Sequence, residues 1–318
     1  MFTECSEQLF GSSEHFHISC GVLGESVKPA AFEYRNSRDE DEVFDLLTKY
    51  GSEAKVLAGG QSLIPLMNFR LVKPSLVVDI NGVSSLRGVK VSSSTLRLGA
   101  LTRHVELETR PDVAQAAPLL SAVAPYIGHP QIRTRGTLGG SLSHADPSAE
   151  LPAAMVALDA TILVKGASEE RRVQAEEFFK FHLTADLAVD ELVVGVEIPV
   201  FGPNQGFGFR EVSARFGDFA TVGALAVLSV GPDGTVERSR VVCMAVGPKP
   251  IRIGSAESVL NGKQISPAIL GEVAEAVAEA LDPIADLKAS ASYKRRTAAT
   301  LARRAVEEAW EMTAGRVS

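Results

Sequence analysis

Two glycine-rich segments, residues 58–62 and 137–141, place the strongest constraint on how this chain can fold. Each contains a pair of glycines that is followed within two residues by a serine. Because glycine has no Cβ atom, the backbone at such a pair can approach a phosphate closely, and successive N–H groups form a concave site for an anion. Two such segments far apart in the chain predict a fold that brings them together around one extended ligand. A diphosphate with a nucleoside at one end fits this description.

The composition of the chain is that of an ordinary globular protein. Its 318 residues are 45% hydrophobic and 22% charged, which predicts one to three domains with a sizeable core. The net charge of -7 argues against binding to DNA or RNA. No apolar run approaches the roughly 18–20 residues that are needed to cross a bilayer.

The cysteines exclude several kinds of metal site. Cys5, Cys20 and Cys243 are scattered and form neither a C-x-x-C pair nor a zinc-binding spacing. An odd number of cysteines in a chain of this length fits a reducing compartment, so we expect a cytoplasmic protein. An iron–sulfur cluster normally needs four ligands, so we expect any such cluster, and any metal, to be bound by another chain.

The first 27 residues differ from the rest of the chain. They are rich in Ser, Glu, Gly and His and show no clear periodicity. They lack the basic start and apolar core of a secretory signal. We expect residues 1–27 to be a disordered leader or the product of an over-extended start site, with the native protein beginning near Val27.

Residues 28–82 show alternating strand and helix patterns. Three strands are predicted, at 32–34, 55–58 and 76–80. Ser37 and Glu40 are spaced as a capping box at the start of a helix, and Gly51 is placed to end that helix. The first glycine segment therefore lies between a strand and a helix, which is a common position for binding phosphate.

The remainder of the chain predicts two further units. Residues 83–202 contain predicted strands and helices at 96–100, 113–126, 150–158, 160–164 and 191–198. After a linker at 202–206, three strands are predicted at about 206–213, 222–230 and 238–246, followed by two helices. Strands followed by helices indicate an α+β fold. We predict a domain at 28–202 with subdomains at 28–82 and 83–202, and a C-terminal α+β domain at 203–318.

With these segments in view, the chain resembles the medium, FAD-binding subunit of molybdenum hydroxylases, the family of carbon monoxide dehydrogenase and split-subunit xanthine dehydrogenase. The resemblance is carried, in order, by residues 28–34, 55–65, 137–147, 217–220 and 292–296. It implies a vanillyl-alcohol oxidase-type, or PCMH-like, FAD-binding domain of two α+β subdomains. It also implies that the C-terminal α+β domain covers the flavin.

The resemblance implies a set of cofactor-binding residues, with no catalytic residue and no metal ligand in this chain. They are Leu57, Ala58, Gly59, Gly60, Gln61, Ser62, Leu63, Thr137, Leu138, Gly139, Gly140, Ser141, Asp146, Glu150, Leu192, Arg210 and Phe219. The two glycine loops would hold the FAD diphosphate. Leu138 would approach the isoalloxazine, Glu150 would bind ribityl or ribose hydroxyls, Phe219 would pack on the flavin, and Arg210 would place a cation near the ring.

Each of these residues also has a purely structural interpretation. Either glycine segment alone is typical of a tight strand-to-helix turn. Asp146 could cap a helix, Glu150 could be a first-turn carboxylate, and Phe219 could belong to the core. His144 is a candidate base, but a hydrogen-bonded loop histidine is the simpler interpretation, and the same holds for His129.

The resemblance implies a heteromeric enzyme. A small [2Fe-2S] subunit and a large molybdopterin subunit would accompany this chain, in a dimer of heterotrimers. FAD on this chain would receive electrons from the iron–sulfur centres of the partner and pass them to an external acceptor. Two other functions stay open: a self-contained flavin oxidoreductase of the same fold, and a non-catalytic nucleotide-binding scaffold. The chain contains no G-x-G-x-x-G after a strand, no P-loop, no G-x-S-x-G and no H-E-x-x-H.

Overall fold

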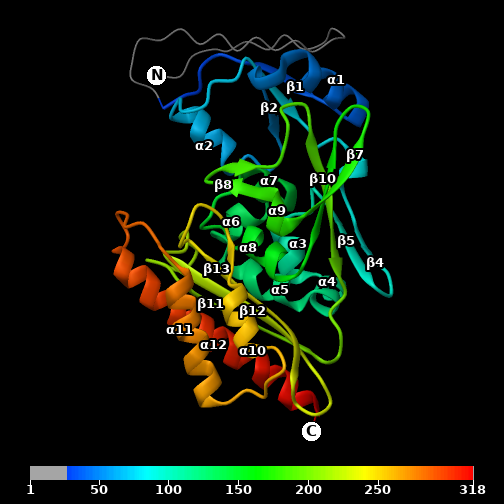
Figure 1. Cartoon of the computed structure of the whole chain (residues 1–318). Coiled ribbons are helices and arrows are strands. Elements are labelled where there is room, and N and C mark those ends of the chain that lie inside the picture. The colour runs from blue at the N-terminus through cyan, green and yellow to red at the C-terminus, as the bar shows by residue number, and fades with distance from the viewer. Residues whose placement is uncertain (1–26, 318) are drawn as a thin grey trace.

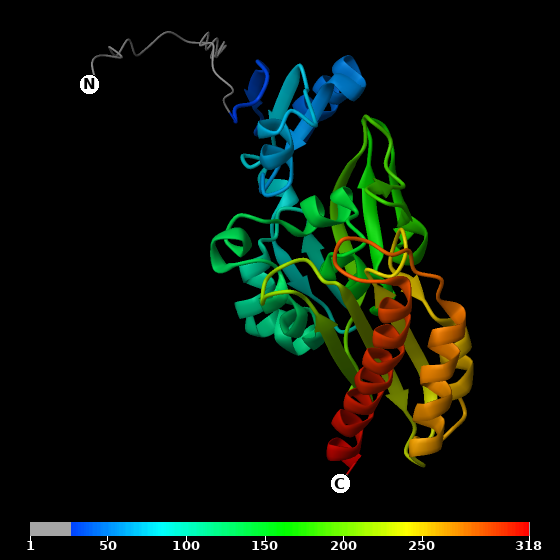
Figure 2. The ribbon, with the colours of Figure 1, turned by 90° about the vertical axis from the view of Figure 1, so that its left-hand side faces the viewer.

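A computed structural model describes residues 27–317 of the chain. The predicted leader, residues 1–27, lies outside the described residues apart from its last position. Three main sheets follow one another along the chain, and we call them the N-terminal, central and C-terminal sheets. Figure 1 shows the N-terminal sheet at one end of the molecule and the C-terminal helices toward the other, and Figure 2 shows the same order from the side.

The N-terminal sheet is parallel and has the strand order β1-β3-β2. Its elements are β1 (Glu33–Asn36), α1 (Glu40–Tyr50), β2 (Ala54–Leu57), α2 (Leu63–Asn68) and β3 (Leu76–Asp79), with short 3₁₀ turns at Gly51–Glu53 and Ser84–Leu86. Since parallel strands end at the same edge of a sheet, β2 delivers the first glycine loop to the edge at which β3 also ends. The predicted order of strands and helices over this region agrees with these elements.

The predicted capping box at the start of α1 is wrong. The helix begins at Glu40, and the carboxylate of Asp39 caps it by accepting a hydrogen bond of 3.1 Å from the backbone N–H of Asp41. Glu40 instead accepts a hydrogen bond of 2.6 Å from Lys165 in the central sheet. Gly51 follows the helix with φ of 51°, a conformation that favours glycine, and ends it as predicted.

The core of the N-terminal unit is completed by residues from outside it. Val43, Phe44 and Leu47 of α1 are buried in one cluster with the strands of this sheet. The same cluster contains Leu101, which follows β5, and Leu192, the first residue of β10. The first sheet and its helix therefore bury their apolar face partly against the central unit.

The central sheet is antiparallel, with strand order β4-β5-β10-β6-β7. Its strands are β4 (Val89–Val91), β5 (Thr95–Gly99), β6 (Thr161–Lys165), β7 (Glu170–Gln174) and β10 (Leu192–Pro199). A small pair, β8 (Phe179–Phe181) and β9 (Thr184–Ala185), forms a separate hairpin. The helices between β5 and β8 are α3 (His104–Thr109), α4 (Pro111–Ala116), α5 (Pro118–Val123), α6 (Pro130–Arg133), α7 (Leu138–His144), α8 (Glu150–Ala157) and α9 (Ala175–Phe178).

The single helix predicted at 113–126 is divided in the structure. It consists of α4, α5 and a 3₁₀ turn over Ala124–Tyr126. Pro118 is the first residue of α5, and Pro125 lies within the 3₁₀ turn. Proline lacks the N–H that a continuous helix needs at these positions, so the chain changes direction at each of them.

The C-terminal sheet is antiparallel and covered by helices on one face. It contains β11 (Gln205–Val212), β12 (Val222–Val230), β13 (Val236–Met244) and β14 (Ile251–Arg252), followed by α10 (Gly254–Leu260), α11 (Pro267–Ala280) and α12 (Ala291–Val317). The helices α11 and α12 lie along its outer face (Figure 2). A Cβ atom at Gly208 would lie 2.0 Å from the carbonyl oxygen of Ala305, so α12 packs directly on the backbone of β11.

The middle strand of the C-terminal sheet is buried on both faces. Ala224, Ala226 and Leu228 of β12 pack toward the C-terminal helices, whereas Leu225 and Val227 belong to the core of the central unit. This arrangement joins the central and C-terminal units through a continuous apolar layer. Within residues 27–317, no helix is both long enough and apolar enough to cross a membrane.

Candidate functional site

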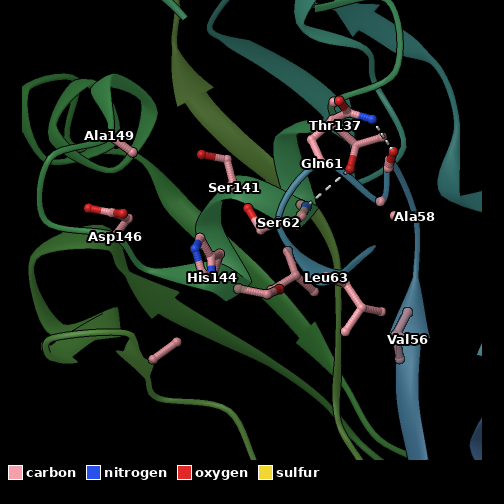
Figure 3. Close-up of a pocket in the computed structure, with 18 of the residues that line it drawn as sticks. Val56, Ala58, Gln61, Ser62, Leu63, Thr137, Ser141, His144, Asp146 and Ala149 are labelled. Atoms are coloured by element: carbon pink, nitrogen blue, oxygen red, sulfur yellow. Dashed lines mark hydrogen bonds between the residues drawn. The ribbon is translucent and has the colours of Figure 1, made fainter. Parts of the chain in front are cut away.

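A cavity of about 770 Å³ opens where the three units meet. Its volume lies within the range of ordinary ligand and cofactor sites. Its walls come from the loop after β2, from α7 and the segment before α8, from the β8–β9 hairpin, and from the loop between β11 and β12. Figure 3 shows Ser62, Ser141, His144 and Asp146 around the same space.

The two glycine loops meet backbone to backbone beside this cavity. A Cβ atom added to Gly59 would lie 2.5 Å from the carbonyl oxygen of Arg135 and 2.8 Å from the Cα atom of Gly136. A Cβ atom added to Gly139 would lie 2.6 Å from that of Ala100. Real side chains cannot approach so closely, so these positions require glycine for packing. The convergence predicted from the sequence is observed.

The first loop carries the free hydrogen-bond donors. The backbone N–H groups of residues 59–62 donate to no acceptor in the described part of the chain. Gly60 has φ of 73°, which turns the backbone so that consecutive N–H groups can converge on one ligand atom. The side chain of Gln61 steadies the turn by donating to the carbonyl oxygen of Gly59 at 2.9 Å. A row of unpaired N–H groups beside a cavity is a site for an anion.

The second loop contributes differently, because the N–H groups of residues 138–141 are already paired. Leu138 donates to the carbonyl oxygen of Thr102 at 2.9 Å, and Gly139 donates to that of Ala100 at 2.8 Å. The hydroxyl of Thr137 caps α7 by accepting from the N–H of Gly140 at 3.2 Å (Figure 3). This loop therefore offers the cavity the side chain of Ser141 and a closely packed wall.

A buried histidine, to which the sequence patterns assign no role, fixes the second loop. His104 is 6% exposed, and its Nε2 lies 3.0 Å from the carbonyl oxygen of Thr137. Burial lowers the pKa of His104 to about 4, so the ring is neutral and Nε2 carries the proton that it donates. Its Nδ1 is buried without a hydrogen-bond partner in the described chain. The only sequence signal for this role is its position shortly after the strand predicted at 96–100.

Two carboxyl groups, those of Asp146 and Glu150, line the cavity. Asp146 accepts a hydrogen bond of 2.8 Å from the N–H of Ser148, which makes a local turn rather than the helix cap considered above. The helix α8 begins four residues later, at Glu150, after an N-cap at Ala149. Glu150 is 4% exposed and lines the cavity, and burial raises its pKa to about 7.

The cavity is also lined by an aromatic side chain. Phe219, in the loop between β11 and β12, is 54% exposed, so it is not a core residue. The ammonium group of Lys288 lies 5.9 Å from the centre of its ring and donates to its carbonyl oxygen at 2.9 Å. The exposed ring face is available to stack on a planar ligand.

Most of the predicted cofactor-binding residues line this one cavity. They are Ala58, Gly59, Gly60, Gln61, Ser62, Leu63, Thr137, Gly139, Gly140, Ser141, Asp146, Glu150, Leu192 and Phe219. Three others do not line it. The side chain of Leu138 is fully buried in the central core, that of Leu57 contacts the Gly60 turn, and Arg210 forms an ion pair of 3.2 Å with Glu308.

Apolar residues that were not predicted complete the walls. The β8–β9 hairpin and the segment after it contribute Leu183, Leu187 and Val189, and other parts of the chain contribute residues such as Ile127 and Val193. The hairpin strands are too short to produce a recognisable alternation in the sequence. The resulting site combines unpaired N–H donors, buried carboxyl groups, apolar walls and an exposed ring, as expected for a ligand with an anionic centre, hydroxyl groups and a flat ring system.

Comparison with known proteins agrees with this class of site. Residues 30–201 match the model of the FAD binding domain in molybdopterin dehydrogenase, and residues 207–309 match that of the CO dehydrogenase flavoprotein C-terminal domain. The fold and the site thus define an FAD-binding flavoprotein. The chain belongs to the family of FAD-binding medium subunits of molybdenum hydroxylases, and it is a subunit of a dehydrogenase complex.

The chain is similar to several characterised proteins, whose names refer to different substrates. The chain is 38% identical to the 6-hydroxypseudooxynicotine dehydrogenase complex subunit alpha of Paenarthrobacter nicotinovorans, over 89% of this chain and 96% of that protein. It is 37% identical to the caffeine dehydrogenase subunit beta of Pseudomonas sp. strain CBB1, over 89% and 96%. It is 34% identical to the carbon monoxide dehydrogenase medium chain of Hydrogenophaga pseudoflava, over 89% and 98%.

Solved structures share the whole architecture. A chain of carbon monoxide dehydrogenase from Hydrogenophaga pseudoflava superposes with a TM-score of 0.87 at 34% identity, covering 89% of this chain and 99% of that one. A chain of quinoline 2-oxidoreductase from Pseudomonas putida 86 gives a TM-score of 0.86 at 36% identity, covering 90% and 99%. The predicted α+β, PCMH-type fold is confirmed.

Proposed function

We propose that this chain holds FAD in the cavity and passes electrons from iron–sulfur centres on a partner chain to an external acceptor. The single observation that carries the proposal is the row of unpaired N–H groups at residues 59–62, facing a cavity that three units enclose. In this proposal the iron–sulfur clusters lie on another chain, because three scattered cysteines, of which Cys243 is buried, do not supply the four ligands that a cluster normally needs.

We further propose the assembly that the family resemblance implies. It contains a small [2Fe-2S] subunit and a large molybdopterin subunit, arranged as a dimer of heterotrimers in the cytoplasm. The names of the relatives support separate subunits, since they denote a complex subunit alpha, a subunit beta and a medium chain. We also propose that residues 28–202 and 203–318 act as the FAD-binding and covering domains.

The hydrogen-bonding groups and the aromatic ring that line the cavity match the chemical groups of FAD. The N–H groups of residues 59–62 would bind the diphosphate, together with the hydroxyls of Ser62 and Ser141. Glu150 would accept hydrogen bonds from ribityl or ribose hydroxyls, and Phe219 would pack on the ring system. Bound FAD would supply two-electron redox chemistry, and the chain's own task would be to hold, orient and shield it.

Purification of the full chain, alone and with its partner subunits, tests this function. We expect about one FAD per chain, measured by absorbance after release, because one cavity with one anion site accepts one dinucleotide. We expect the flavin of the isolated chain to stay oxidised with the substrate of the complex, and to be reduced once the partner subunits are added.

Three outcomes distinguish the alternatives. A chain that is colourless and takes up no added FAD would overturn the proposal and leave a nucleotide-binding scaffold. Reduction of the flavin by a small substrate in the isolated chain would indicate a self-contained oxidoreductase. Reduction only in the presence of the partner subunits supports the electron-transfer role.

A further inference from the structure

Glu150 is a buried carboxyl group at the wall of the cavity with no cation beside it. It is the first residue of α8, and its only hydrogen-bond donor in the described chain is its own N–H group. The charge that acts on it is the like charge of Asp146. An ionised carboxylate in such a place loses its hydration without gaining a partner.

A second carboxyl group, Glu211, lies on the other side of the contact between the central and C-terminal units. It stands on β11, opposite Gly223 of β12. Both of its carboxyl oxygens are buried, and neither has a hydrogen-bond partner among the described residues. The like charge of Glu150 acts on it unfavourably, and the charge of Lys288 acts on it favourably. The two glutamates therefore interact electrostatically, although one belongs to the central unit and the other to the C-terminal unit.

The basic groups around the pair are engaged elsewhere. The ammonium group of Lys288 donates to the carbonyl oxygens of Phe219 and Ala220, at 2.9 and 3.4 Å. On β13, which packs on α8, Arg240 binds Asp159 at 2.7 Å. On β11, Arg210 binds Glu308. On α7, burial lowers the pKa of His144, so its imidazole ring is mostly uncharged at neutral pH.

We propose that Glu150 and Glu211 form a proton-holding pair across this contact, and that Glu150 releases a proton when a hydroxyl-bearing ligand fills the cavity. The pair holds protons because each carboxyl group is removed from water without a cation. A ligand hydroxyl that donates to Glu150 stabilises the ionised form and so drives the release. The inference rests on the proposed function, in which FAD supplies those hydroxyls.

The step balances without any redox partner. The O–H bond of the Glu150 carboxylic acid breaks, and the proton passes to the buffer. The resulting carboxylate accepts a hydrogen bond from the ligand hydroxyl, whose own O–H bond stays intact. Glu211 then faces a full negative charge and keeps its proton, because a neighbouring like charge disfavours its ionisation. One proton is therefore released for each ligand bound.

The acid–base properties of the two groups agree with this scheme. Burial raises the pKa of Glu150 to about 7. Burial and the charge of Glu150 raise the pKa of Glu211 to about 8. At about pH 6 Glu150 is then mostly protonated in the empty protein, and at about pH 8.5 it is mostly ionised before any ligand arrives. The release should be close to one proton at the lower pH and close to none at the higher pH.

Calorimetric titration of FAD into the FAD-free full chain tests the proposal. The titration is repeated in buffers of different ionisation enthalpy, and the dependence of the binding heat on that enthalpy counts the protons released. In the wild type we expect close to one proton per FAD at about pH 6 and almost none at about pH 8.5. Glu150→Gln keeps a hydrogen-bond acceptor but holds no proton, so it should bind FAD without release. Glu170→Gln, the same change at an exposed residue of β7 that does not line the cavity, should keep the release.

The role of Glu211 has its own spectroscopic signature. The infrared spectrum of the FAD-bound wild type at neutral pH should contain a carboxylic-acid carbonyl band that is missing in Glu211→Gln. A spectrum without that band would remove Glu211 from the pair. FAD binding that is independent of the buffer, or a release that survives in Glu150→Gln, would overturn the proposal. No binding heat in any buffer would instead overturn the proposed function itself.

Discussion

Single buried carboxyl groups determine the acid–base behaviour of this site. Glu150 and Glu211 interact electrostatically yet differ in access, because Glu150 lines the cavity and both oxygens of Glu211 are enclosed. A ligand can therefore change the ionisation of Glu150 directly, whereas Glu211 responds only to its neighbour and to pH. His104 is a contrasting case, since its low pKa keeps it neutral over the whole working range.

We predict that Glu211→Gln removes a loss of stability at alkaline pH. The pKa of Glu211 is raised to about 8 in the folded protein, from an ordinary value of 4.5. Between these values the folded state binds a proton that the unfolded chain does not, so stability is greatest at the acidic end and falls as pH rises toward 8. Glutamine does not titrate, so the variant should gain on the wild type by roughly 1–2 kcal/mol between about pH 6 and 8, a value reduced for the partial exposure of the side chain.

Urea unfolding of both proteins at the two pH values measures this difference. Glu150 titrates in both proteins, so the difference between them reports Glu211 together with its coupling to Glu150. Stability curves that run parallel from pH 6 to 8 would mean that Glu211 is ionised in the folded protein, contrary to its enclosed position.

At the scale of elements, the site depends on how closely two loops approach. The loop after β2 and the loop before α7 touch through Gly59 and Gly136, and His104 holds the latter loop through Thr137. No hydrogen bond between the two glycines is needed, because the contact is one of shape. A side chain at this junction would separate the unpaired N–H groups from the opposite wall of the cavity.

We predict that Gly59→Ala weakens FAD binding and lowers stability by about 1–3 kcal/mol, the usual cost of overpacking. The added methyl group would meet the backbone of Arg135 and Gly136, which cannot move aside as a flexible side chain can. Gly271→Ala is the matched control, because nothing lies within 4 Å of its Cβ position in α11. That change should stabilise the helix by about 0.5–1 kcal/mol and leave FAD content unchanged. Equal FAD content in the two variants would show that the loop contact is unimportant for binding.

At the scale of the whole molecule, the cavity draws its walls from all three units. A ligand that fills it binds only when these units are assembled, so binding and global folding are linked. In the proposed complex FAD would contact both the loop after β2 and Phe219, whereas its fragments would contact only part of the site.

We predict that FAD raises the unfolding temperature of the full chain in one cooperative transition. At a free FAD concentration of about 100 times Kd, the stabilisation should be about 2.7 kcal/mol. FMN, which lacks the adenosine half, should stabilise less at the same concentration. Differential scanning calorimetry provides the measurement. An early transition that FAD leaves unmoved would mean that one unit unfolds independently of the cavity.

The sequence predicts those parts of the fold in which one pattern continues without interruption. The strand expected at 222–230 is observed as β12 with the same bounds, since its apolar run is buried on both faces. The helix expected at 113–126 is interrupted at its prolines, and the cap of α1 moves from Ser37 to Asp39. Choices between neighbouring caps depend on packing that is set by distant segments.

The candidate site is predictable where residue types alone carry the signal. Glycine pairs close to serines mark the two loops in the sequence, and the fold brings these loops together. The roles of His104 and Glu211 are not predictable in this way. A histidine or glutamate acquires a perturbed pKa only when other segments remove it from water, and those segments are far away in the sequence.

The apolar cluster of the N-terminal unit includes Leu101 and Leu192, which the ribosome adds long after β3. During synthesis, the first sheet and α1 leave the ribosomal exit tunnel while part of their apolar face is still exposed to solvent. At about 5–20 residues per second, several seconds pass before β10 arrives to close it. The nascent chain thus exposes an apolar surface early in translation. Chaperones that bind nascent chains would bind first to this N-terminal unit.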